Sequence, residues 1–262
     1  MNNTPSFNIA ECARHAYFKT WEERHYLAKM AIIPLLVKFL CYAVSASYIE
    51  QSNILHLSFM MLPSYIVEGW FLAHWARTVI LDHRWPFRSS GDDKKDMDII
   101  QKRARGVMAG MVSFALINFL IAGYFAYFFS LLPPELDPNN ADPRVAIVGV
   151  VMIVSTVMLF RFVWGYIALA LNISFKSFLK VIQSGMLNFP MIGMWIVCFV
   201  PAYSAMQVTG VLFQGMQGES EVAVLQGMEM FSRAAFDMIK NLLTTAAFAY
   251  AIMELLKWQK KN

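Results

Sequence analysis

The stretch that decides the fold is residues 57–105, which read LSFMMLPSYIVEGWFLAHWARTVIL (57–81) and then DHRWPFRSSGDDKKDMDIIQKRAR (82–105). The first part is an apolar run, and about 20 apolar residues of helix cover a bilayer core of roughly 30 Å. The second part is polar and rich in Lys and Arg, which is typical of a cytoplasmic loop. The stretch therefore predicts a transmembrane helix followed by a basic cytoplasmic loop.

The composition of the whole chain favours the same class of protein. Hydrophobic residues make up 58% of the 262 residues and charged residues 15%, against roughly 25% charged in soluble domains. We therefore expect an all-α polytopic membrane protein with about six transmembrane helices in one domain, residues 27–262. The expected spans are 27–49, 57–81, 106–132, 145–171, 189–212 and 236–256.

Residues 1–26 precede the first span and contain an amphipathic helical pattern from about Phe7 to Tyr26. The pattern predicts a helix that lies along the membrane interface, with packing on cytoplasmic loops as the alternative. Its expected apolar face consists of Ala10, Ala13, Tyr17 and Trp21. Residues 174–188 and 219–232 carry similar patterns and predict two short interfacial elbow helices.

The distribution of positive charge predicts the orientation, because Lys and Arg gather on the cytoplasmic side. The far side is expected to carry Arg144, Arg233 and Lys240 with a set of acids that includes Asp237. Both termini are then cytoplasmic, as an even number of spans also requires, and we expect a bacterial inner membrane. The cytoplasmic set consists of Arg14, Lys19, Arg24 and Lys29; Arg84, Arg88, Lys94, Lys95, Lys102, Arg103 and Arg105; Lys176 and Lys180; and Lys257, Lys260 and Lys261.

Four ionisable residues lie inside the apolar spans: Lys38, Glu68, His74 and Arg161. Such residues cost about 2.5–3.5 kcal/mol each at the centre of a span, so they usually face the protein interior and pair. At about 1.5 Å per residue, the depths of Lys38, Glu68 and Arg161 agree within a few ångström. We therefore expect Glu68 to pair with Lys38 or Arg161.

This expected cluster has two interpretations. It either holds the helices in register, or its two cations and one acid leave a surplus positive charge that lines a cavity for an anionic headgroup or metabolite. His74, Asn118 and Asn241 are candidates for a polar lining, with His74 favoured as a hydrogen-bonded packing residue. Gly106 and Gly110 form a GxxxG pair that predicts close helix packing.

No enzyme motif, nucleotide-binding loop or metal-ligand spacing is present in the sequence, and Cys12, Cys41 and Cys198 are scattered. We therefore expect no catalytic residues, metal or cofactor. Nucleic-acid binding is disfavoured because the basic residues lie next to the spans. The first span is expected to remain as an uncleaved anchor.

Two stretches, AHWARTVILDH (73–83) and RFVWGYIALALNISFKSFLKVIQSGMLNF (161–189), resemble uncharacterised bacterial inner-membrane proteins. That group is related to the membrane domain found with some glycerophosphodiester phosphodiesterases. Arg161, residues 168–172, Gly185 and Asn188 would correspond to its Arg, small-residue stretch and Gly-Asn re-entry, although the family's Pro before the elbow is missing here. The resemblance implies a six-helix bacterial membrane fold and no catalytic residues.

From these patterns we expect a non-enzymatic membrane scaffold or accessory subunit that docks partners through the N-terminal helix and the loop Asp82 to Arg105. Its expected partners are the lipid bilayer and other membrane-protein subunits. The alternative is a small transporter or lipid-handling protein that binds an anionic ligand, such as an anionic lipid, at Lys38, Glu68 and Arg161.

Overall fold

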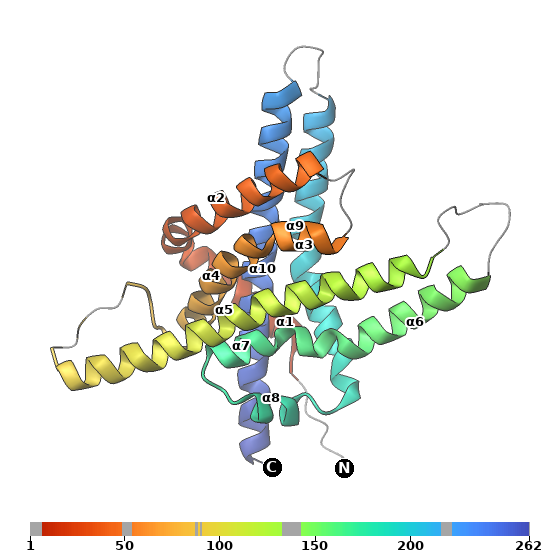
Figure 1. Ribbon diagram of the computed structural model, residues 1–262. Coiled ribbons are helices and arrows are strands. Elements are labelled where there is room, and N and C mark those ends of the chain that lie inside the picture. Colours follow the sequence, from red (N-terminus) through yellow and green to blue (C-terminus); the bar gives the residue numbers. More distant parts are fainter. Residues whose placement is uncertain are drawn as a thin grey trace.

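The computed structural model describes residues 7–48, 54–86, 89, 91–132, 143–215 and 222–261. These residues are almost entirely helical (Figure 1). The helices are α1 (Ile9–Glu22), α2 (Arg24–Tyr48), α3 (Ile54–Met60), α4 (Leu62–Leu81), α5 (Asp93–Ser130), α6 (Pro143–Leu159), α7 (Gly165–Ala170), α8 (Phe175–Val181), α9 (Asn188–Gly215) and α10 (Val222–Lys261), with the 3-10 turns η1 (Phe160–Trp164) and η2 (Gly185–Leu187).

Five segments of the described chain are long and apolar enough to cross a membrane. They correspond to five of the six expected spans, and the chain is an all-α polytopic membrane protein, as predicted. The segments are Arg24–Tyr48, Asp93–Ser130, Pro143–Ala170, Gly185–Phe213 and Val224–Gln259.

The remaining expected span, 57–81, is divided into α3 and α4 at Met61 and is not among those five. Pro63 lies at the start of α4, and within one continuous helix its ring would clash with the carbonyl of the residue four positions earlier. Every residue from Phe71 to Thr78 is buried, and α4 contacts α2, α5, α7 and α10. Because other helices enclose it, α4 accommodates the polar residues that lower its hydropathy.

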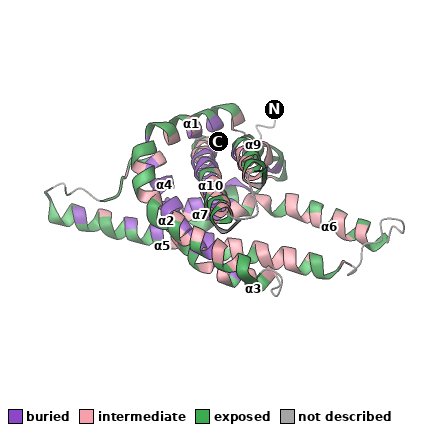
Figure 2. Ribbon diagram, turned by 90° about the horizontal axis from the view of Figure 1, so that it is seen from above, coloured by how far each residue is buried: buried purple, intermediate pink, exposed green. Residues whose placement is uncertain are grey.

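Two long helix pairs give the molecule its shape. Helices α9 and α10 lie side by side, and α5 and α6 form a hairpin that extends to one side of them (Figures 1 and 2). No residue of α6 is buried. The Tyr124 hydroxyl of α5 holds this hairpin together, since it lies 2.7 Å from Ser155 Oγ and 2.9 Å from Thr156 Oγ1 of α6.

Helix α5 begins thirteen residues before the expected span, so residues 93–105 are helical and the prediction of a loop throughout 82–105 was wrong. The Asp92 side chain caps the helix by accepting a hydrogen bond from Lys95 N, at 3.3 Å. Asp93 and Asp96 lie in the first turn, where negative charge interacts favourably with the helix dipole. Capping therefore extends the helix beyond its apolar part.

Helix α1 packs against α9 and α10, with Cys12, Ala13 and Ala16 buried. The Tyr17 hydroxyl donates to the Val197 carbonyl at 3.1 Å. The packed face is rotated from the expected one, because Ala10 and Trp21 are exposed. The helix thus packs on transmembrane helices while its other side carries exposed aromatic residues.

The first expected elbow helix is present, whereas the described part of the second forms no separate helix. Ser174 caps α8, and the buried residues of this helix are Phe178 and Val181. In the part of 219–232 that the structure describes, residues from Val222 onward belong to the continuous helix α10. Glu229, the described acid of this stretch, therefore lies on an extension of the last span.

Gly106 and Gly110 allow α5 to approach α4 and α7 closely within the chain. A Cβ atom at Gly110 would lie 2.7 Å from Ala170 Cβ and 3.2 Å from Ala73 Cβ. At Gly106 it would lie 2.7 Å from the Ala170 carbonyl oxygen. The GxxxG pair therefore serves internal packing.

We expect Gly110→Ala to destabilise the protein by about 1–3 kcal/mol, because the added methyl group forces packed backbone apart. Gly149→Ala in α6 is the matched control, since a Cβ there meets nothing within 4 Å and Ala favours helix. Thermal unfolding in a mild detergent compares the two variants with the wild type. Equal stability of the two variants would contradict the packing described for Gly110.

Cys12 should not react with a maleimide reagent in the folded protein at neutral pH. It is 1% exposed, and burial, with a smaller effect of the Glu254 charge, raises the pKa of its thiol to about 12. Single-cysteine variants retaining Cys12, or carrying Phe18→Cys at a position 70% exposed, test this by mass spectrometry. Rapid labelling of Cys12 in the folded state would show that α1 does not pack as described.

Candidate functional site

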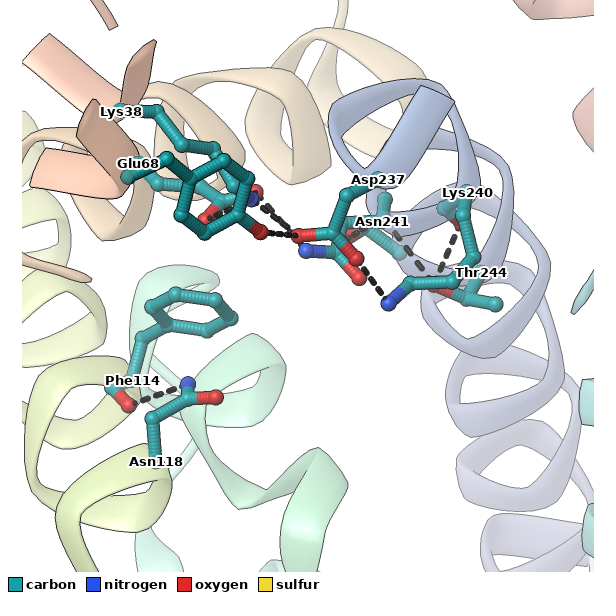
Figure 3. A network of polar contacts seen from close by, with 10 residues as sticks. Lys38, Glu68, Phe114, Asn118, Asp237, Lys240, Asn241 and Thr244 are labelled. Carbon is teal, nitrogen blue, oxygen red and sulfur yellow. Dashed lines mark hydrogen bonds and ion pairs between the residues drawn. The ribbon is translucent and has the colours of Figure 1, made fainter. Parts of the chain in front are cut away.

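A buried ion pair joins α2 to α4 near the middle of both helices (Figure 3). Lys38 and Glu68 are each only 2% exposed. The Lys38 ammonium donates to both carboxylate oxygens of Glu68, at 2.9 Å to Oε1 and 2.8 Å to Oε2. The structure thus pairs Glu68 with Lys38, one of the two partners that its depth allowed.

Helix α10 adds a second acid and a second cation to this pair. Lys38 also forms an ion pair with Asp237 Oδ2, and Lys240 pairs with Asp237 Oδ1. The Tyr42 hydroxyl donates to Asp237 Oδ2 at 3.4 Å. Two lysines and two carboxylates make the cluster formally neutral, so it carries no surplus positive charge.

Polar side chains continue the network from Glu68 along α10 to α7. Asn241 Nδ2 donates to Glu68 Oε1 at 2.8 Å (Figure 3). One turn later, the Thr245 hydroxyl donates to the Asn241 carbonyl at 2.6 Å and lies 2.7 Å from the Tyr166 hydroxyl. We call the residues Lys38, Tyr42, Glu68, Asp237, Lys240 and Asn241 the charge network.

Arg161 lies outside the charge network, so the expectation that it could be the partner of Glu68 was wrong. Its guanidinium donates to the carbonyls of Ile182 and Gln183, at 3.2 and 3.4 Å, and covers the Phe162 ring. Arg161 belongs to η1, and the tighter 3-10 winding changes the direction of its side chain from that on a continuous α-helix. Arg161 therefore binds the carbonyls that follow the C-terminal end of α8, the first elbow helix.

Of the three candidate lining residues, Asn241 alone contacts the charge network. Asn118 donates to the Phe114 carbonyl of its own helix at 2.9 Å (Figure 3). His74 lies 3.1 Å from Arg103 Nη2 through its Nδ1, and its ring contacts Trp70 and Trp85. His74 is thus a hydrogen-bonded packing residue.

The basic segment is divided between buried and exposed residues. Arg103 is 4% exposed and donates to the Arg84 carbonyl at 2.6 Å, while Arg84 pairs with Glu23 at 2.6 Å. Lys102 pairs with Asp98 on the surface of α5. Lys94, Lys95 and Arg105 are exposed, and Arg88 lies outside the described residues.

Tyr42, Asp237 and Lys240 were missed as members of the cluster. The charge distribution places Asp237 and Lys240 on the far side of the membrane, although both fall inside the expected span 236–256. The spacing of Asp237, Lys240 and Asn241 places all three on one helix face, and this was the signal that could have revealed them. Depth alone cannot show which helices are neighbours.

The arrangement acts as a clamp between α2, α4 and α10. Each acid is paired with at least one lysine, which is the condition under which buried charges are tolerated. Within the described part of the chain, no group of three or more His, Cys, Asp and Glu residues could hold a metal ion. The chemistry that this geometry supports is interhelical bonding.

Comparison with known proteins gives no relative: no family model matches the chain, and no curated protein or solved structure matches it.

Glu68→Gln should destabilise the protein by about 3–5 kcal/mol, because it leaves one uncompensated positive charge in the buried cluster. Lys38→Met should have a similar cost with the opposite charge imbalance. The double variant restores neutrality and is expected to be less destabilised than either single variant. Unfolding of all three in mild detergent gives this coupling.

The exposed pair Lys102 and Asp98 provides the control, with side chains 67% and 57% exposed. Lys102→Gln should change stability by no more than about 1 kcal/mol. Additive losses in the Lys38 and Glu68 variants would exclude the clamp.

Proposed function

We propose that the protein is a non-enzymatic scaffold or accessory subunit of a bacterial inner-membrane complex. It docks its partners through α1 and the segment Asp82–Arg105, with both chain ends in the cytoplasm. The observation that carries this proposal is the length of α5. Its 38 residues extend over roughly 57 Å, against about 30 Å for the bilayer core.

The first turns of α5 extend beyond the rest of the molecule (Figure 1). They expose Met97 (66%) and Ile100 (44%) beside charged residues. Apolar side chains surrounded by polar ones are a common feature of docking surfaces. This surface supports docking of a protein partner.

The neutrality of the charge network favours a scaffold over the alternative function. A transporter or lipid-handling protein with an anionic ligand at Lys38, Glu68 and Arg161 needs a surplus positive charge there. Asp237 removes this surplus, and Arg161 binds backbone carbonyls elsewhere. The buried charges are better explained as interhelical bonds that keep the docking surface rigid.

A pull-down of the tagged full-length protein from its native membrane in mild detergent tests the proposal, with mass spectrometry of proteins and lipids. We expect a stoichiometric membrane-protein partner. The double variant Met97→Ser, Ile100→Ser should lose most of it, because the apolar contact is removed.

Met108→Ser is the matched control, since Met108 is 54% exposed on the apolar part of the same helix, and it should retain the partner. The neutral double variant of Lys38 and Glu68 should retain it as well, provided that it folds. Isolation of the protein alone, or equal partner recovery with all variants, would contradict the docking function.

A further inference from the structure

The Leu81 end of α4 carries a second set of buried cations, separate from the charge network. Arg77 is 2% exposed, and its Nη1 donates to the Ala170 carbonyl at 2.8 Å. A guanidinium has five N–H donors, yet this is its one hydrogen bond among the described residues, and its Nε is buried without a partner. Arg77 is thus poorly satisfied for a buried charge.

Arg103 approaches the same region from α5 and contacts neutral acceptors. It donates to the His83 carbonyl at 3.0 Å and lies 3.1 Å from His74 Nδ1, in addition to its bond to Arg84. Its Nε and the Nδ1 of His83 are also buried without hydrogen-bond partners. Arg103 and Gly106 lie one turn apart on α5, and Arg77 Nη1 lies against Gly106, so both guanidinium groups reach the same part of α5. Burial, and then the charges of Arg77 and Arg103, lower the pKa of His83.

The nearby carboxylates do not neutralise these two arginines. Glu23 pairs with Arg84 and Lys19, Asp96 binds Ser89, and Asp82 is exposed at the end of α4. In the described part of the chain, neither Arg77 nor Arg103 forms an ion pair with a carboxylate. Two buried guanidinium groups cost several kcal/mol each unless an anion compensates them.

The backbone carbonyls at the ends of α4 and α7 offset part of this cost, since a helix C-terminus carries partial negative charge. The packing nevertheless fixes the guanidinium in place. A Cβ at Gly106 would lie 2.7 Å from Arg77 Nη1 and 2.7 Å from Asn172 Oδ1, so glycine is required where Arg77 lies against α5. Arg77 and Arg103 thus provide fixed positive charges whose N–H donors are not all used in hydrogen bonds.

We propose that Arg77, Arg103 and His83 form a binding site for a phosphate-bearing anion at the Leu81 end of α4. Paired guanidinium groups match phosphate oxygens in geometry and charge. The ligand is either the headgroup of an anionic phospholipid or free phosphate, which share this chemistry. The site lies beside the exposed basic residue Lys102, whose charge attracts anions to this surface.

The test uses the full-length protein purified in an uncharged detergent without phosphate. Thermal unfolding is followed with inorganic phosphate against sodium chloride of equal ionic strength, and with mixed micelles containing phosphatidylglycerol against phosphatidylcholine. We expect stabilisation by one of the two anionic probes beyond its control. A response to phosphatidylglycerol alone identifies a lipid headgroup, and a response to inorganic phosphate identifies the free anion.

Arg77→Lys keeps the charge but removes the planar donors, and Arg103→Gln removes one charge. Each should weaken the apparent affinity for the effective probe by about tenfold or more. Arg105→Gln removes an exposed charge two residues away and should retain the wild-type response. Each variant is compared with its own ligand-free unfolding, so a lower starting stability does not obscure the result. A wild type that responds to neither probe, or equal responses of Arg77→Lys and Arg105→Gln, would overturn the proposal.

Discussion

The structure depends on one ammonium group, that of Lys38, which lies between the carboxylates of Glu68 and Asp237. A charge in the interior of a membrane protein has no water to stabilise it, and lipid cannot replace a partner. Each of these residues therefore requires the other helices to be present at the correct depth. This requirement fixes α2, α4 and α10 relative to one another.

Around this interaction, α4 is buried from Phe71 to Thr78 and contacts α2, α5, α7 and α10, and this enclosure explains its composition. Small residues bring α5 and α7 close to it, because Ala73, Gly110 and Ala170 leave little space between the backbones. Helices at the periphery, such as α6, are apolar and exposed instead. The ionisable residues of α4 thus lie in the protein interior, among a mainly apolar core, and away from the lipid.

The two groups of buried charges that include a residue of α4 differ in the way that they are compensated. Glu68 is part of a neutral cluster in which every charge has a partner. Arg77 and Arg103, two turns and more away, are held by carbonyl groups and an imidazole. A completed cluster stabilises the bundle, whereas an incompletely satisfied one can still accept a ligand. The same helix therefore carries both a clamp and a candidate binding position.

The sequence by itself determined the membrane class, the position of five spans, the α8 elbow and the isolated charges, because run length, hydropathy and helical spacing are local properties. Only the tertiary structure decided which helices are neighbours. By depth alone, Lys38 and Arg161 were equivalent candidates for pairing with Glu68. In the structure, Arg161 lies in a 3-10 turn and points elsewhere, whereas Lys38 contacts both Glu68 and Asp237 of α10. The early start of α5 follows from the local cap at Asp92, a signal that a hydropathy profile does not detect. Partners at membrane depth come from different helices, and a one-dimensional pattern contains no record of their rotation or proximity.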